Sequence, residues 1–163
     1  TTIWNGSRYP AEATDKLHHY SGALCMAADS SGKCASVFYI MSTLPGGDSI
    51  TQELTDQMNS AGYRAEVVSA YQTVGGAPYL DYTDTVLGQV YEGMDVVDTI
   101  AQAAVDENQK PTETITINSV SIETYQAQEQ LKMTKPAFLW QQESRFCAIP
   151  VQISPGCSLR QAR

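Results

Sequence analysis

Short apolar runs alternate with polar, glycine-rich turns along the first three quarters of the chain. Residues 22–28 and 36–42 form two such runs, and turn-forming residues at 29–32 and 45–47 follow them. A third run, residues 86–91, has the same texture. Because runs of this length and composition are typical of strands in a buried sheet, we predict a sheet built from short strands.

The segment from residue 48 to about residue 74 is predicted to be helical. Its first half places apolar side chains at four-residue intervals, at Ile50, Leu54 and Met58. Ser49, with Gln52 three residues later, matches a capping box, and Gly62 would end the helix after about three turns. A second, weaker helix is expected over about 65–73.

A third helix is predicted directly behind Gly93. Its apolar face consists of Met94, Val97, Ile100, Ala101 and Ala104. Since the apolar run 86–91 comes just before it, the local order is a strand followed by a helix.

The last apolar segment of this part, residues 114–124, predicts a strand with an irregularity. Its apolar side chains occupy odd positions at first and even positions later: Ile115, Ile117, Val120 and Ile122. Because side chains alternate between the two faces of a strand, we predict a β-bulge or bend near residues 118–119. Together, the elements favour a mainly β fold with helices, an antiparallel sheet that is closed or nearly closed.

Charge divides the chain near Tyr125. Residues 1–125 carry five basic and sixteen acidic side chains, net −11, whereas residues 126–163 carry five basic and two acidic ones, net +3. The whole chain of 163 residues has a net charge of −8, which argues against nucleic-acid binding because that requires clustered positive charge. We expect one domain over 1–125 and an appended, poorly ordered tail over 126–163, to which we assign no function.

Several residue types that often carry chemistry lack a supporting motif. The four cysteines form no CxxC pair, so we expect free or core thiols and a reducing, cytoplasmic compartment: Cys25, Cys34, Cys147 and Cys157. The adjacent His18 and His19 are expected in a solvated loop, and four aspartates in a turn and a solvated helix start: Asp81, Asp84, Asp95 and Asp98. No apolar run is long enough to predict a membrane span.

Five blocks, in the same order, resemble the cyclophilin-type peptidyl-prolyl isomerases, and the resemblance covers roughly residues 2–125. The blocks are GALCMA (22–27), SVFYI (36–40), GGAPYLD (75–81), VLGQVYEGMDVVDTI (86–100) and ITINSVSI (115–122). The helical insertion between the second and third blocks is similar to that of bacterial members. The resemblance implies an eight-stranded antiparallel barrel capped by helices, with a shallow groove for Xaa-Pro segments of unfolded or nascent proteins and no cofactor or metal.

Carried over residue by residue, the resemblance implies a groove with altered contacts. Ala27 matches the family's alanine after methionine, Tyr39 falls where a phenylalanine lies at the floor of the proline pocket, and Leu80 matches the pocket leucine. Tyr79 replaces the usual tryptophan, and Asp84 stands where a histidine lines the pocket. We therefore expect these five residues to contact substrate.

Other family positions depart further. Val37 and Ala28 stand where a glutamine and an asparagine contact the peptide. The family's catalytic arginine block precedes the segment matched here by residues 3–6, so we expect the arginine to lie upstream of Thr1 and the chain to be an N-terminally truncated, weak or inactive isomerase. The alternative is a non-catalytic module that binds proline-containing peptides.

Overall fold

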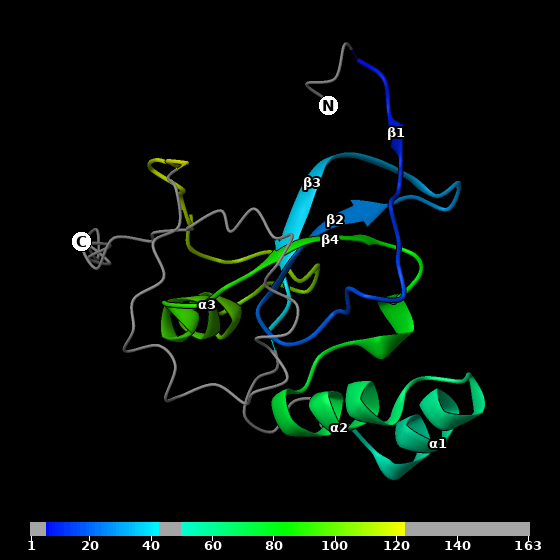
Figure 1. Ribbon diagram of the computed structural model, residues 1–163. Coiled ribbons are helices and arrows are strands. Elements are labelled where there is room, and N and C mark those ends of the chain that lie inside the picture. The colour runs from blue at the N-terminus through cyan, green and yellow to red at the C-terminus, as the bar shows by residue number, and fades with distance from the viewer. Residues whose placement is uncertain (1–5, 43–49, 123–163) are drawn as a thin grey trace.

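The computed structural model describes residues 6–42 and 50–122, and a four-stranded antiparallel sheet forms their centre (Figure 1). The strands lie in the order β1-β3-β2-β4, with bounds Tyr9–Pro10 for β1, Ala23–Ala28 for β2, Lys33–Ile40 for β3 and Thr85–Gln89 for β4. The strands predicted from the three apolar runs are confirmed, with ends shifted by a few residues. The fold is mainly β with helices, as expected for a cyclophilin-like sheet.

A tight turn joins β2 to β3 and sets their register. Asp29 Oδ1 accepts the backbone N–H groups of Ser31 and Lys33, at 2.8 and 3.1 Å, and Gly32 takes a φ of +70°. Beyond the turn the register shifts, because Ala28 lies opposite Cys34 while Met26 already lies opposite Phe38. The ladder is regular again from Phe38 onwards.

In residues 6–42 and 50–122, three α-helices and one 3-10 helix accompany the sheet. Their bounds are Gln52–Ser60 for α1, Ala65–Val74 for α2, Pro78–Leu80 for the 3-10 helix η1 and Met94–Ala101 for α3. The predicted N-cap is wrong, because Thr51 Oγ1 accepts the N–H of Leu54 at 3.2 Å and begins α1 later than Ser49 would. The helix α3 ends at Ala101, so Ala104 lies outside the helix to whose apolar face it was assigned. No helix in the described ranges is long and apolar enough to cross a bilayer.

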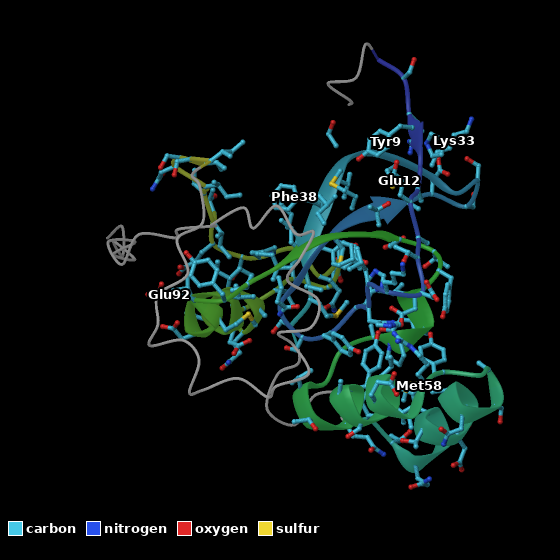
Figure 2. All side chains as sticks on the ribbon, viewed as in Figure 1. Tyr9, Glu12, Lys33, Phe38, Met58 and Glu92 are labelled. Atoms are coloured by element: carbon cyan, nitrogen blue, oxygen red, sulfur yellow. The ribbon has the colours of Figure 1, made fainter. Side chains whose placement is uncertain are left out.

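The apolar core has two parts. The first lies where α1 and α2 pack side by side, and contains Tyr20, Met58, Val67, Val68 and Tyr71 (Figures 1 and 2). The second lies on the sheet and contains Ala23, Cys25 and Val86, with Tyr39 packed against it. Cys25 and Cys34 are buried free thiols, as predicted, while the predictions for Cys147, Cys157 and the tail 126–163 lie outside the described residues.

The predicted strand at 114–124 is wrong for the part that the structure describes. Residues 114–122 form no strand, and their apolar side chains are exposed, from 41% at Ile115 to 77% at Ile122. Alternation alone does not make a strand, because the segment also needs a neighbouring strand to complete its backbone hydrogen bonds. Among the described residues the sheet has four strands, so the eight-stranded closure implied by the resemblance is not present in them.

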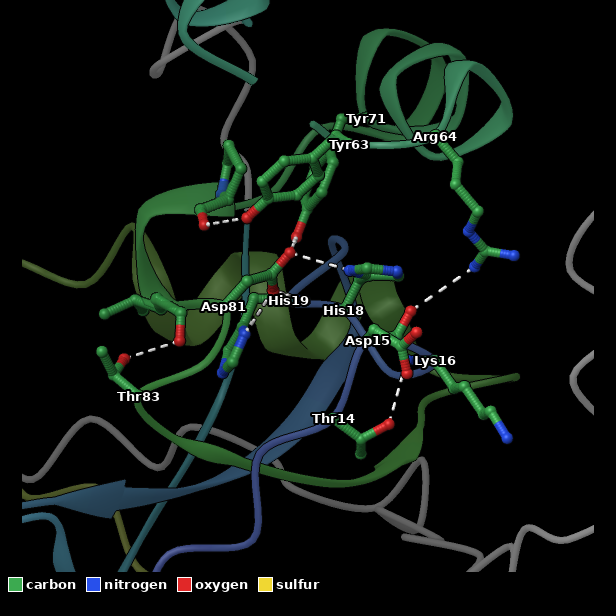
Figure 3. A network of polar contacts seen from close by, with 12 residues as sticks. Thr14, Asp15, Lys16, His18, His19, Tyr63, Arg64, Tyr71, Asp81 and Thr83 are labelled. Atoms are coloured by element: carbon green, nitrogen blue, oxygen red, sulfur yellow. Dashed lines mark hydrogen bonds and ion pairs between the residues drawn. The ribbon is translucent and has the colours of Figure 1, made fainter. Parts of the chain in front are cut away.

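A buried carboxylate, Asp81, joins three parts of this fold (Figure 3). Asp81 Oδ1 accepts the backbone N–H and the ring Nδ1–H of His19, at 2.9 and 2.8 Å, and Oδ2 accepts the Nδ1–H of His18 and the hydroxyl of Tyr71, both at 2.8 Å. A carboxylate only accepts hydrogen bonds, so each ring nitrogen facing it carries the proton. The network connects the segment before β2, the helix α2 and the end of η1.

The expectation that His18 and His19 lie in a solvated loop is therefore wrong, whereas Asp81 lies in a turn as expected but is buried there. Their side chains are buried, and that of Asp81 is 0% exposed. Burial by itself would raise the pKa of Asp81, but the hydrogen bonds from His18 and His19 outweigh burial and lower the pKa to about 2. Loop residues without helical or strand periodicity can still be core residues when they satisfy one another's hydrogen bonds.

Gly76 allows the chain leaving α2 to approach this network. It has a φ of +131°, and a Cβ built on it would clash with the backbone of His19 and Tyr20. The close approach lets Ala77 N–H donate to His19 O at 2.9 Å and Ser21 N–H donate to Gly75 O at 3.1 Å. The helical insertion is thereby tied to the segment that enters β2.

Asp81 should make the stability of the chain depend on acid. Its pKa in the folded chain, about 2, lies below the ordinary 3.8, so its contribution is complete above about pH 4 and is lost as the pH falls towards 2. We expect the free energy of unfolding to decrease by about 2 kcal/mol over this range because of this group alone. Urea unfolding between pH 2 and pH 7 measures it.

Asp81→Asn should be less stable at pH 7 and should lack this part of the acid-dependent decrease. Asp106→Asn is the matched control, because Asp106 accepts two backbone N–H groups in an exposed turn. If Asp81→Asn and the wild type lost stability in parallel between pH 4 and pH 2, the ionised Asp81 network would be contradicted.

Candidate functional site

Tyr39 on β3 is the first element of the candidate site. It lies opposite Cys25 of β2 in the ladder, and its ring packs against the second part of the core. Its hydroxyl donates to Asp84 Oδ2 at 2.7 Å, and its ring is stacked on that of His19 with centroids 6.5 Å apart. Burial, and then the bond to the carboxylate, raise the pKa of Tyr39, so it remains a neutral donor at physiological pH.

Asp84 connects the two central strands to the loop that precedes β4. Besides the bond from Tyr39, its Oδ1 accepts the backbone N–H of Ala28 at 3.0 Å. The loop itself is closed by the carbonyl of Leu80, which accepts the N–H groups of Thr83 and Asp84 at 3.1 and 3.3 Å. Asp84 lies at the end of the turn that was expected there, and it is half-buried and engaged through both carboxylate oxygens.

Tyr79 and Leu80 lie on η1, which Pro78 begins. The fixed φ of proline suits the first position of a helical turn, and the turn closes with Leu80 N–H donating to Ala77 O at 3.0 Å. Leu80 is half-buried, whereas the Tyr79 side chain is 70% exposed. An exposed aromatic ring beside a half-buried leucine can contact the apolar and polar parts of a peptide together.

The remaining predicted residue, Ala27, lies on β2 where the register to β3 shifts. It is half-buried and directly precedes Ala28, whose N–H is bound to Asp84. The structure thus brings Tyr39, Asp84 and the backbone beside Ala27 together, and links Asp84 to Leu80 through the loop. In the described part of the chain, no hydrogen bond or ring contact connects Tyr79 to Tyr39.

A small cavity lies elsewhere on the sheet. Its volume is about 10 Å³, and it is lined by Leu24 and the β4 segment Leu87, Gly88, Gln89, Val90, Tyr91 and Glu92. None of the five predicted site residues lines it. Because such a volume holds about one water molecule, it is too small for a prolyl ring.

The sequence analysis missed the contacts that His19 and Asp81 make behind the candidate site. His19 stacks on Tyr39 and binds Asp81, so it stands behind the candidate site rather than in solvent. The block GGAPYLD contains Asp81, yet nothing in its spacing predicts a histidine partner sixty-two residues earlier. The one available signal was that both histidines of the chain are adjacent in sequence.

The candidate site contains the acidic Asp84, and the two described arginines pair with other carboxylates. Arg8 binds Asp29 at 3.0 Å, and Arg64 binds Glu66 at 3.4 Å. These are the two arginines in residues 6–42 and 50–122, and neither forms an ion pair with Asp84. Within the same ranges, no group of three or more His, Cys, Asp or Glu side chains is arranged to hold a metal ion.

Comparison with known proteins assigns the family. The family model described as "Cyclophilin type peptidyl-prolyl cis-trans isomerase/CLD" matches residues 2–122. A Staphylococcus saprophyticus protein named "Putative peptidyl-prolyl cis-trans isomerase" is 32% identical over 117 residues, 72% of this chain and 57% of that protein. Proteins of the same name from Staphylococcus epidermidis and Staphylococcus aureus are 30% and 29% identical over 118 residues, 72% of this chain and 58% of each protein.

The chain therefore spans somewhat more than half the length of the curated relatives that it matches. The matched region includes β2, β3, η1 and β4, which carry all the candidate site residues. The chain belongs to the cyclophilin-type peptidyl-prolyl cis-trans isomerase family.

Proposed function

We propose that this chain forms the proline-binding part of a peptidyl-prolyl cis-trans isomerase that acts on Xaa-Pro segments of unfolded or nascent proteins. The observation that carries the proposal is the assembly of Tyr39, Asp84 and Leu80: the Tyr39 hydroxyl is held by Asp84 at 2.7 Å, and the loop that positions Asp84 begins at Leu80. Family membership supports the same assignment.

Prolyl isomerisation requires a site that binds the prolyl ring and changes the polarity around the peptide bond. Rotation about the peptide bond has a barrier of about 18–20 kcal/mol because the nitrogen lone pair is shared with the carbonyl group. A pocket that holds the prolyl ring against Tyr39 and Leu80 removes water from the bond and disfavours the planar, solvated ground state. A donor to the prolyl nitrogen would localise the lone pair and lower the barrier further.

Asp84 gives this groove a different polarity from that of a histidine-lined pocket. Its carboxylate binds the Tyr39 hydroxyl, so the ring is fixed in one orientation with its polar end turned towards Asp84. The apolar face of the ring remains the part suited to proline. We therefore propose that Tyr39 acts through its ring and that its hydroxyl serves to fix the ring.

A second candidate function is binding without catalysis. It is favoured by the described arginines, because Arg8 and Arg64 are engaged by Asp29 and Glu66 and neither is bound at Tyr39 or Asp84. Arg145, which follows Tyr125 in the sequence, lies outside the described residues. Binding and isomerisation assays on the same sample distinguish the two functions.

Removal of the Tyr39 ring should abolish most peptide binding. We expect Tyr39→Ala to weaken the affinity for a short Ala-Xaa-Pro peptide by about tenfold or more, because a large buried aromatic contact is lost. Tyr39→Phe should lose clearly less, about threefold, since the ring is kept and only the hydrogen bond that fixes it is lost. Titrations followed by ¹⁵N–¹H NMR give the dissociation constants.

Phe38→Ala is the matched control for this series. Phe38 is the neighbouring aromatic residue on β3, its side chain is 52% exposed, and successive residues of a regular ladder point to opposite faces (Figure 2). Equal loss of affinity in Phe38→Ala and Tyr39→Ala would refute a groove at Tyr39. Failure of the wild type to bind any proline-containing peptide would refute the proposed function.

The isomerisation rate of the chain should be low even where binding is normal. Loss of one preorganised donor to the reacting group costs about 100- to 1,000-fold in rate, and the described residues hold no guanidinium at Tyr39 or Asp84. A protease-coupled assay on an Ala-Xaa-Pro-Phe peptide measures the rate. The expectation and the binding-only function would both be contradicted by two results together. The wild-type chain would isomerise the peptide about as fast as a full-length staphylococcal relative, and Tyr39→Ala would abolish that activity.

A further inference from the structure

The helical insertion holds both ends of η1. Tyr63, in the turn between α1 and α2, donates its hydroxyl to the carbonyl of Pro78 at 3.0 Å. Tyr71, on α2, donates its hydroxyl to Asp81 Oδ2 at 2.8 Å. Pro78 and Asp81 are the residues on either side of Tyr79-Leu80, so these two candidate site residues lie between two anchors in the sequence.

The Tyr71–Asp81 anchor is buried and the Tyr63–Pro78 anchor is partly buried, while Tyr79 between them is exposed. Pro78, Asp81 and Tyr71 are buried, whereas Tyr79 is exposed and Leu80 is half-buried. Hydrogen bonds shielded from water hold their partners more firmly than exposed ones, because water cannot replace a lost partner. The insertion thus fixes the ends of the segment and leaves its middle free to meet a ligand.

A third contact lies immediately after the second anchor. Tyr82 has a φ of 67°, a left-handed conformation that is costly for a tyrosine, and its ring meets the ring of Tyr63 edge-on with centroids 6.0 Å apart. Such a conformation persists only where the surroundings enforce it. Tyr63 therefore contacts residues on both sides of the candidate groove segment.

The same network reaches Tyr39, the candidate site residue on β3. Asp81 binds the ring of His19, and His19 stacks on Tyr39. Tyr71, Asp81, His19 and Tyr39 thus form a continuous series of contacts from α2 to β3. A displacement of η1 relative to Tyr39 would have to break one of these contacts.

We propose that Tyr63 and Tyr71 are positioning residues of the peptide groove, which set the place of Tyr79 and Leu80 relative to Tyr39. The proposal rests on the proposed function, since it concerns the same groove. It gives the helical insertion a direct role in substrate binding through the groove segment. Neither tyrosine contacts the substrate itself.

The test removes single hydroxyl groups and measures peptide affinity. In Tyr63→Phe and Tyr71→Phe we expect the dissociation constant for an Ala-Xaa-Pro peptide to rise about three- to tenfold, the effect of one lost hydrogen bond. The ¹⁵N–¹H signals of Tyr79 and Leu80 in the free protein should shift. Tyr63→Phe is the milder change, because Tyr63 is half-buried and Tyr71 is fully buried.

Tyr20→Phe is the matched control. Tyr20 is buried in the same core and its ring lies 4.6 Å from that of Tyr71, yet its hydroxyl has no hydrogen-bond partner among the described residues. The affinity of the Tyr20→Phe variant for the Ala-Xaa-Pro peptide should stay within about twofold of the wild-type value. A loss equal to that of Tyr63→Phe would mean that any change in this core weakens binding, and would overturn the proposal.

A double-mutant cycle with Leu80→Ala separates positioning from general destabilisation. If Tyr63 acts through Leu80, then Tyr63→Phe should change affinity by less than about twofold in the Leu80→Ala background. Full additivity, or wild-type affinity in both tyrosine variants, would overturn the proposal while leaving the proposed function intact. If the wild type bound no proline peptide, the proposed function and this proposal would both fall.

Discussion

The described structure depends on one buried carboxylate that accepts four hydrogen bonds. Asp81 lies between the segment entering β2, the insertion helix α2 and the loop leading to β4, and each of these supplies or carries a partner. An ionised carboxylate without these donors would be costly to bury, so the three segments are constrained to meet there. The candidate groove lies beside this meeting point: η1 ends at Asp81, and Tyr39 stacks on His19.

This arrangement explains how a small sheet can hold the candidate site residues in fixed positions. The Asp81 network touches both apolar clusters of the described residues, because Tyr71 belongs to the first, and Tyr39, which packs against the second, stacks on His19. Asp84 is a second carboxylate that joins two segments, since it accepts hydrogen bonds from the Tyr39 hydroxyl on β3 and from the backbone N–H of Ala28 on β2. Hydrogen bonds therefore fix the position of the Tyr39 ring, whose apolar face is the surface that the proposed function assigns to proline.

The sequence predicted the elements that depend on local pattern. The strands β2, β3 and β4 and the helices α1, α2 and α3 follow from apolar runs, helical spacing and glycine stops, although Thr51 rather than Ser49 caps α1. The network around Asp81 could not be predicted, because its two histidine partners lie 63 and 62 positions before it and no periodicity relates them. For residues 114–122 the pattern predicted a strand that the structure does not contain. The apolar and polar residues alternate clearly there, but a strand also needs a neighbouring strand, which the alternation does not specify. For the candidate site, Tyr39 and Asp84 were identified through the resemblance, whereas their contact emerged only in the fold.

The protonation of the two histidine rings tests the central claim most directly. If Asp81 is an ionised acceptor of four hydrogen bonds, Nδ1 of both His18 and His19 must carry a proton at neutral pH. Long-range ¹H–¹⁵N correlation spectra of the imidazole rings report which nitrogen is protonated. The account predicts a protonated Nδ1 in both rings; a neutral ring protonated at Nε2 alone, in either histidine, would contradict it.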